Sequence, residues 1–308
     1  MPGWDWTNAN LVSSIKRRAS VPTVQNLFTV DDFLSLGDEE LQNTIFPMIM
    51  SIKGDYFTAN QDTVMTTATT YPIPQDAIGL KIKNLYWLQT TPYQRFVEIT
   101  QLSQTDISRQ FAGGWAQFGF YIDNNSIVLV PSGFSGQTLR IKYYKRASRL
   151  VPNEEGGQIT AINTGTKQVT LATLPTAFAV NSLVSGIDNN PGFETKASSL
   201  TITAIASPVI TLSDVSNLAV GYYICFDNES VIPQITVEAM PILAQSVAVK
   251  CLEAMNDPGL GNAQTKLGEI VTTFLATMTP RVDSQVPKVV QRSGPLAWKK
   301  INRYWGAK

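Results

Sequence analysis

The side chains that most often carry out chemistry are scarce in this chain of 308 residues, which contains no histidine and only two cysteines, Cys225 and Cys251. Transition-metal sites are built mainly from histidine and cysteine, so a site of that kind is not expected. The lack of histidine also removes the usual general base and the Ser–His and Cys–His nucleophile pairs. Cys251 falls on the apolar face of a predicted helix, which favours a core position. We therefore predict a protein that is not an enzyme, with no catalytic residues, no metal and no cofactor.

Three polar clusters could still do chemistry in principle. Residues 123–125 (DNN) and 188–190 (DNN) offer oxygen atoms of the kind that bind calcium, but neither has the EF-hand pattern or its terminal glutamate. Turns rich in Asp and Asn explain both. Glu154 and Glu155 are a carboxylate pair of the kind that hydrolysis uses, followed by Gly156 and Gly157. A solvated loop at a domain boundary is the expected structure there.

The C-terminal segment, residues 281–308, differs from the rest of the chain in charge. It contains seven Lys or Arg and one acidic residue, Asp283, which gives a net charge of +6. The whole chain is formally neutral, so residues 1–280 carry −6. Pro280, Pro287 and Pro295 prevent a continuous helix across this segment, because proline breaks a helix interior.

A short amphipathic helix is predicted after Pro295, with Trp298, Ile301 and Trp305 at positions i, i+3 and i+7 on one face. Such a helix is too short to be stable alone in water. Two tryptophans on a basic terminal helix favour folding into a groove of a partner. The predicted partner-binding residues are Trp298, Lys299, Lys300, Ile301, Arg303, Tyr304 and Trp305.

Other interpretations of this segment stay open. The helix could close the core of its own chain, or its aromatic and basic residues could stack bases and neutralise phosphates. A membrane-surface helix is a weaker variant. The acidic remainder of the chain repels a polyanion, which disfavours direct nucleic-acid recognition. Lys16, Arg17 and Arg18 form a second basic run, for which a solvated helix end is expected and contact with a partner or nucleic acid is the alternative.

The composition is that of a globular protein, with 44% hydrophobic and 16% charged residues. No apolar run approaches the 18 residues of a membrane span, so no membrane association is predicted. The first residues, MPGWDWTNAN, lack the basic and apolar regions of a signal peptide. The two cysteines do not indicate a disulfide framework, so synthesis in a reducing cytoplasm is expected.

The two ends of the chain are predicted to be helical. One helix extends from Thr7 to about Ala19, with Leu11 and Ile15 inward. A second is capped by Thr29 and carries a hydrophobic staple of Phe28 and Phe33. Gly37 is expected to separate it from a further helix with inward residues Leu41, Ile45, Met48 and Ile52. Two helices are predicted in residues 237–279, with inward residues Met240, Leu243, Val247, Cys251, Ala254, Leu267, Ile270, Val271, Phe274, Leu275 and Met278.

The middle of the chain shows the period-2 pattern of strands. Strands are predicted at residues 63–70, 80–89, 117–122, 126–130 and 138–145, with a hairpin turn at 123–125. Residues 152–232 contain an internal similarity: ITAI and VTL, which begin at Ile159 and Val169, recur from Ile202 and Ile210 as ITAI and ITL. Two similar β-units are therefore expected to form one small sandwich or barrel.

These segments predict an α+β fold, in which a helical bundle from the N- and C-terminal helices accompanies a β-rich body and an inserted small β-sandwich or barrel. The predicted domains are residues 1–151 (first half of the bundle and β-rich body), 152–232 (inserted β-domain), 233–280 (second half of the bundle) and 281–308 (docking tail).

The chain resembles the head-to-tail adaptor, or connector, proteins of tailed bacteriophages, especially those with short tails. The similarity is carried by residues 11–22 (LVSSIKRRASVP), the acidic residues 31–40 that lead to Tyr56, 71–79 (YPIPQDAIG), 238–257 and 280–283 (PRVD).

The resemblance implies a virion structural protein of the neck, between the capsid portal and the tail. Its subunits would form a homo-oligomeric ring, usually a dodecamer, that contacts the portal protein and a tail or nozzle protein. Viral DNA would pass through the channel during genome ejection without specific binding. The C-terminal tail would dock on the portal.

The alternative function is a receptor- or glycan-binding structural protein of a tail fibre or baseplate, with residues 152–232 as the recognition head. Trp87, Tyr93 and Trp115 would then offer stacking surfaces for sugar rings, although core positions are the expected ones for these aromatics.

Overall fold

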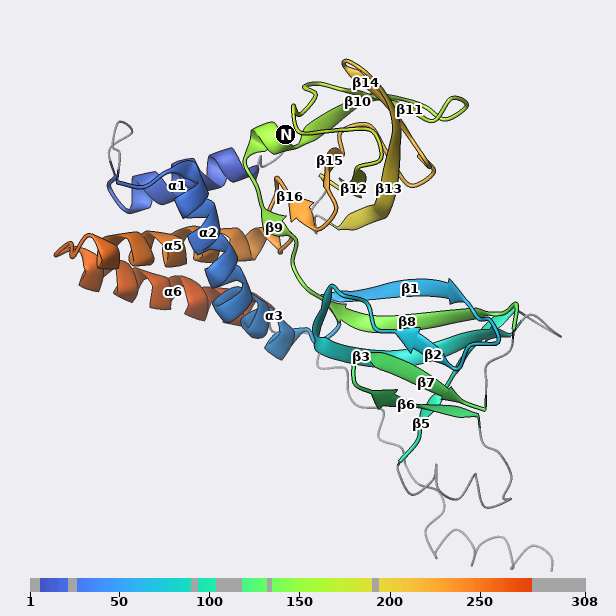
Figure 1. Cartoon of the computed structure of the whole chain (residues 1–308). Coiled ribbons are helices and arrows are strands. Elements are labelled where there is room, and N and C mark those ends of the chain that lie inside the picture. The colour runs from blue at the N-terminus through green and yellow to red at the C-terminus, as the bar shows by residue number, and fades with distance from the viewer. Residues whose placement is uncertain are drawn as a thin grey trace, which may run out of the picture.

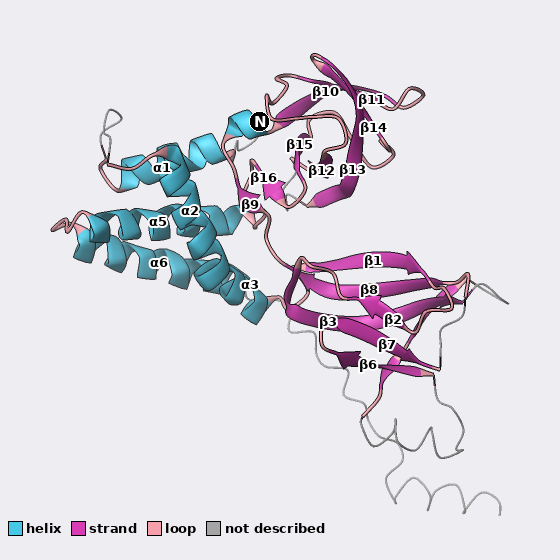
Figure 2. Ribbon diagram, viewed as in Figure 1, coloured by secondary structure: helices cyan, strands magenta, loops and turns pink. Residues whose placement is uncertain are grey.

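The computed structural model describes residues 6–21, 27–89, 94–103, 118–131, 135–189 and 194–278. The fold is mixed α+β, with a group of helices, a β-rich body and a closed six-stranded barrel (Figures 1 and 2). In Figure 1 the helices lie on the left, the barrel lies at the upper right and the body lies at the lower right.

The helices come from both ends of the described chain. The N-terminal ones are α1 (Asn8–Arg18), α2 (Val30–Glu40), the π-helical segment η1 (Leu41–Ile45) and α3 (Phe46–Ile52). The C-terminal ones are the 3₁₀ turn η3 (Val237–Ala239), α5 (Met240–Ala254) and α6 (Leu260–Met278). A further 3₁₀ turn, η2 (Asn153–Glu155), precedes the barrel.

The predicted start of α2 is confirmed. The Thr29 hydroxyl accepts a hydrogen bond from the Asp32 amide at 3.2 Å, and the Thr29 amide donates to the Asp32 carboxylate at 2.7 Å. Such a capping box satisfies two amides that lack helical partners. The rings of Phe28 and Phe33 lie 5.5 Å apart, as expected for a staple.

The predicted break at Gly37 is wrong, because α2 continues through this residue into η1 and α3. A Cβ atom at Gly37 would lie 3.1 Å from Cδ1 of Leu150. This glycine therefore allows close packing against a strand and does not end the helix.

Helix α5 lies at the centre of the helices, in contact with α1, α2 and α6. It was predicted to have one inward face, but most of its circumference is buried, including the polar residues Gln245 and Ser246. Ala254, which was predicted to face inward, is exposed, and Leu275 of α6 is 37% exposed. A helix that packs against three other helices is buried on more than one face. The periodicity of apolar residues therefore predicted too few of the buried positions of α5.

The β-rich body consists of two four-stranded sheets that share one hydrophobic core. One sheet has the order β1-β8-β3-β4 and the other β2-β7-β6-β5. The core contains residues of both sheets, among them Leu85, Ile127 and Ile141, each at most 1% exposed. The strands are β1 (Thr58–Val64), β2 (Thr70–Pro72), β3 (Ala77–Gln89), β4 (Arg95–Glu98), β5 (Thr100–Gln101), β6 (Gly119–Asp123), β7 (Ser126–Val130) and β8 (Thr138–Lys145).

The sequence predictions for the body succeed best in the hairpin and in β8. Strands β7 and β8 have the predicted bounds, and Asp123 pairs with Ser126 around the predicted turn. The strand predicted at 63–70 is wrong in its bounds, since β1 ends at Val64 and β2 begins at Thr70. Residues in between are rich in threonine, which favours strands without specifying register.

The barrel is closed in the order β10-β11-β14-β13-β12-β15. Closure leaves no unpaired sheet edge, which makes the barrel a self-contained β-unit. Its strands are β10 (Gly157–Asn163), β11 (Gln168–Leu171), β12 (Leu183–Ile187), β13 (Thr195–Ala206), β14 (Val209–Leu212) and β15 (Tyr223–Phe226).

The two sequence units adopt matching conformations within the barrel. The pairing of β10 with β11 shifts register between Ile159 and Ala161, and the pairing of β13 with β14 shifts between Ile202 and Ala204. The threonine inside each shift donates its hydroxyl to a carbonyl on the neighbouring strand, in both cases at 3.1 Å. Each irregularity recurs at the position that the sequence similarity aligns.

Two short strands form the neck through which the chain enters and leaves the barrel. Its incoming strand β9 (Arg149–Leu150) and outgoing strand β16 (Glu229–Ser230) pair in parallel. The Asn8 side chain at the start of α1 donates to the carbonyls of Val151 and Ser230, at 2.7 and 2.9 Å. On the other side the Leu150 amide donates to the Asp38 carboxylate of α2 at 2.9 Å. Helices α1 and α2 therefore hold the neck from two directions.

Asp38 makes this contact sensitive to pH. Burial raises the pKa of Asp38 to about 6, although the Leu150 amide and Arg149 oppose the rise. The unfolded carboxyl has a pKa near 3.9, so the folded state binds more protons between about pH 4 and 6. The contribution of Asp38 to stability therefore falls as the pH rises through this window.

Asp38→Asn should stabilise the protein at pH 7 by about 1 kcal/mol, because the amide keeps the hydrogen bond without a partly buried charge. Urea unfolding at pH 4 and pH 7 measures the effect, and the gain should vanish towards pH 4. Glu39→Gln, at the exposed neighbouring position, is the control. A gain of the same size at both pH values would contradict the prediction.

Candidate functional site

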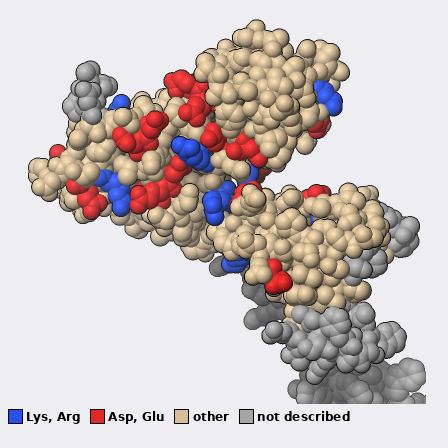
Figure 3. Space-filling model, in the orientation of Figure 1, with Lys and Arg blue, Asp and Glu red and all other residues tan. Residues whose placement is uncertain are grey.

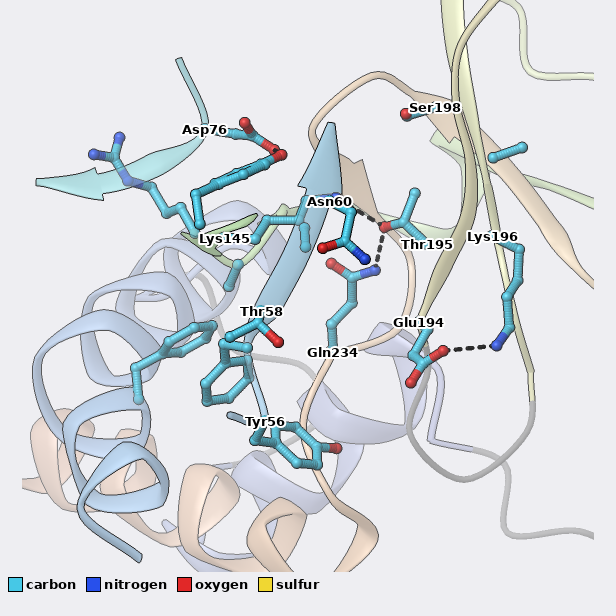
Figure 4. A pocket seen from close by; sticks show the side chains of 17 residues that line it. Tyr56, Thr58, Asn60, Asp76, Lys145, Glu194, Thr195, Lys196, Ser198 and Gln234 are labelled. Carbon is cyan, nitrogen blue, oxygen red and sulfur yellow. Dashed lines mark hydrogen bonds and ion pairs between the residues drawn. The ribbon is translucent and has the colours of Figure 1, made fainter. Parts of the chain in front are cut away.

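A cavity of about 420 Å³ lies where the helices, the body and the barrel meet (Figure 4). Its walls come from Phe46 at the start of α3, from β1 and β8 of the body, and from β13 of the barrel. Side chains from the helices, the body and the barrel converge there. Its labelled polar residues are Tyr56, Thr58, Asn60, Asp76, Lys145, Glu194, Thr195, Lys196, Ser198 and Gln234.

Lys145, the last residue of β8, links the body to the barrel. Its Nζ donates to Oγ1 of Thr195 at 3.2 Å, and Nε2 of Gln234 donates to the same oxygen at 2.9 Å. The Gln234 side-chain oxygen in turn accepts from the Ser148 amide at 3.4 Å. The start of β13 is thus fixed to β8 and to the segment that precedes α5.

The charge on Lys145 is compensated from both sides of the junction. Burial lowers the pKa of Lys145, while Asp76 of the body and Asp227 of the barrel act in the opposite direction. Asp76 also accepts a hydrogen bond from the Tyr143 hydroxyl at 2.9 Å. Burial and this carboxylate raise the pKa of Tyr143, so the phenol remains a hydrogen-bond donor. Lys145 is therefore a half-buried cation whose charged form is favoured by one carboxylate of the body and one of the barrel.

Tyr56 contributes a buried hydroxyl that has no hydrogen-bond partner in the described part of the chain. Burial, together with Glu194 and Glu238, raises the pKa of Tyr56 to about 12. Glu194 is itself paired with Lys196 at 2.7 Å. The Tyr56 hydroxyl can donate to an acceptor that enters the cavity, such as a carbonyl, carboxylate or water oxygen.

The described residues include neither a reactive thiol nor a cluster of metal ligands. Burial raises the pKa of Cys225 to about 12 and that of Cys251 to about 11, so both thiols stay protonated at neutral pH. Across the described ranges, no group of three or more His, Cys, Asp or Glu side chains could hold a metal ion. No helix in these ranges is long and apolar enough to cross a membrane.

The described residues of the polar clusters found in the sequence do not line this cavity, although Asp188 lies next to one of its lining residues. Asn124 occupies a turn with a φ of +50°, and the side chain of Asp123 accepts from it at 3.3 Å, as an Asx-rich turn predicts. Asp188 is buried and lies 3.7 Å from Lys196. A solvated loop was predicted for residues 154–157. Glu154 is exposed and Glu155 is half-buried, but both belong to the 3₁₀ turn η2. Gly156 and Gly157 are buried, so the prediction is wrong for them.

The predicted partner-binding residues lie outside the described residues, as do Tyr93 and Trp115. Trp87 is half-buried and its ring meets that of Phe118 edge-on at 6.2 Å. This contact supports the core position that was expected for Trp87.

Sequence reasoning did not single out Lys145, Thr195 or Gln234 as functional. They belong to separate segments, and no spacing motif connects them. One signal was present: Leu139, Ile141 and Tyr143 alternate inward along β8, and the same alternation places Lys145 on the inward side. A lysine that continues a buried stripe indicates a compensated charge at a junction.

Neither the known protein-family models nor the curated proteins contain a match to this chain.

Proposed function

We propose that this protein is a head-to-tail adaptor of a tailed bacteriophage, which forms a ring between the portal and the tail and leaves a channel for the genome. The proposal rests on the sequence resemblance and on the contrast between the described part of the chain and its basic C-terminal segment.

The arrangement of the helices supports this function. We propose that α1, α2, α3, α5 and α6 act as one bundle, since residues from all of them contribute to a single hydrophobic cluster. In such an arrangement the barrel and the body project from the bundle. Their positions are fixed by the paired strands β9 and β16 and by the hydrogen bonds of Lys145 and Gln234 with Thr195. A rigid subunit with projecting β-units suits a ring that must join two different partners.

The observation that carries the proposal concerns the segment after α6. The helix ends at Met278, and the chain continues with residues 281–308, which carry a net charge of +6 and the two tryptophans Trp298 and Trp305. When extended, 28 residues can span roughly 90 Å. That length is sufficient to reach a neighbouring ring.

The surface charge is compatible with a channel for DNA. On the face shown in Figure 3, acidic side chains gather over the helices and near the base of the barrel, with Lys and Arg among them, and much of the remaining described surface is uncharged. Residues 1–280 carry −6 overall. A conduit without a strong positive field allows DNA to pass without being retained.

Deletion of residues 281–308 should leave a folded subunit that no longer binds the portal ring. The deleted residues come after the last described helix, and the three hydrophobic clusters of the described chain are formed by residues 6–278. Co-sedimentation with purified portal rings measures binding, and thermal unfolding checks the fold. Unchanged binding by the truncated protein would remove the central claim.

A further inference from the structure

A second cavity lies at the end of the helices that is remote from the barrel and the body, between the end of α1 and the turn from α5 to α6 (Figure 1). Its volume is about 610 Å³. Three cationic residues line it: Arg17 and Arg18 of α1 and Lys266 of α6. The apolar side chains of Leu252 and Ile270 also line this basic groove.

Arg18 is held in position by its neighbours. Its Nη1 donates to Oε1 of Gln245 at 2.9 Å and its Nε donates to Oγ of Ser14 at 3.3 Å. Gln245 is only 3% exposed, and its Nε2 donates to the carbonyl of Ala263 at 3.2 Å. The buried side-chain amide of Gln245 thus holds the Arg18 guanidinium and links α5 to α6. A guanidinium fixed in this way loses little entropy when it binds an anion.

The positive charge of the groove is not neutralised within the described chain. None of the six ion pairs found there includes Arg17, Arg18 or Lys266. The one carboxylate in the lining, Asp257, accepts a hydrogen bond from the Gly259 amide at 2.7 Å. Burial and the charge of Arg17 lower the pKa of Arg18, because both disfavour the charged guanidinium. The groove therefore suits a segment that combines carboxylates with apolar side chains.

The start of α2 has those properties. Leu27 is 65% exposed and Val30 is 44% exposed. The exposed residues Asp31 and Asp32 come directly after them, and the Asp32 carboxylate caps the helix through Thr29. This acidic knuckle, residues 27–32, contributes no residue to the lining of the basic groove.

We propose that the basic groove of one copy binds the acidic knuckle of a second copy. The two surfaces are complementary in charge and in apolar character, and they belong to different elements. Such a contact is heterologous: each subunit uses one surface for one neighbour and the other surface for the next, which generates a ring when the rotation closes. This inference rests on the proposed ring and identifies the surfaces that would form it.

Cysteine crosslinking between two variants tests the contact. Asn262→Cys, in the lining of the basic groove, and Val30→Cys, in the acidic knuckle, leave the charges of the contact intact. The two proteins are mixed and treated with a short bis-maleimide, and both native cysteines are buried. We expect a crosslinked dimer that contains one copy of each variant. Thr166→Cys, at an exposed turn of the barrel, replaces Val30→Cys as the matched control and should give no dimer. Absence of the expected dimer, or equal yields with the control, would overturn the proposal.

Charge reversal provides a second measurement on the intact chain. Arg17→Glu and Asp31→Lys should each reduce the crosslinking yield about tenfold, and the protein that carries both changes should recover most of it. Failure of recovery, with both single variants folded by circular dichroism, would argue against direct pairing. The protein that lacks residues 281–308 should crosslink normally. Loss of portal binding and loss of this contact are therefore separate outcomes, and either can fail alone.

Discussion

A protein with Trp298→Ala and Trp305→Ala should bind the portal at least about a hundredfold more weakly than the native chain. Buried tryptophans dominate binding energies at interfaces, and about 2 kcal/mol for each corresponds to about three orders of magnitude in affinity if both contribute fully. The two residues share one face of the predicted helix with Ile301. A helix of about three turns gains its stability only on binding, so it depends on these anchors.

The measurement is a titration of labelled portal rings with the variant and with the native protein at two salt concentrations. Asn302→Ala, on a different face of the same helix, is the matched control and should bind normally. Replacing Lys299, Lys300 and Arg303 with glutamine should mainly reduce the salt dependence, because solvent-exposed charges accelerate association more than they hold a complex. If the double tryptophan variant binds like the control, the tail is not anchored by its apolar face.

Local physical rules were sufficient where a structure depends on neighbours in the sequence. The capping box at Thr29 and the hairpin around residues 123–126 satisfy their hydrogen bonds within a few residues. The similarity between the two units of residues 152–232 also predicted a small β-unit, and the chain forms a closed barrel there. Repetition is informative because two segments of similar sequence are expected to fold and pack in the same way.

Prediction failed where distant segments determine the environment of a residue. Gly37 has the residue type of a helix end, yet it allows contact with Leu150, which lies more than 100 positions later in the chain. The environment of Lys145 depends on Asp76 and Asp227, which come from the body and from the end of the barrel. The alternation along β8 indicates that Lys145 faces inward, but no local pattern identifies its partners, because Asp76 and Asp227 are unremarkable in their own segments.

Gly157→Ala should destabilise the barrel by about 2 kcal/mol, because no space is left for a side chain at this position. Gly157 pairs with Ile224 where β10 meets β15 and the barrel closes. A methyl group there would lie 2.8 Å from the carbonyl oxygen of Thr173 and 2.7 Å from Cδ1 of Leu171. The leucine can rotate, but the carbonyl belongs to the backbone, so relief requires a shift of the strand. The reduced freedom of the unfolded chain offsets only part of this cost.

Gly165→Ala is the matched control, because Gly165 is exposed and its nearest contact, Oδ1 of Asn163, would be 3.5 Å away. Its effect should stay within about 0.5 kcal/mol. Urea unfolding measures both variants, and hydrogen exchange should show the loss of protection in β10 and β15 for Gly157→Ala alone. If the two variants are equally stable, β10 can move relative to β15 at Gly157 without a loss of stability. The junction through β13 and Lys145, which relies on a rigid barrel, would then require a different explanation.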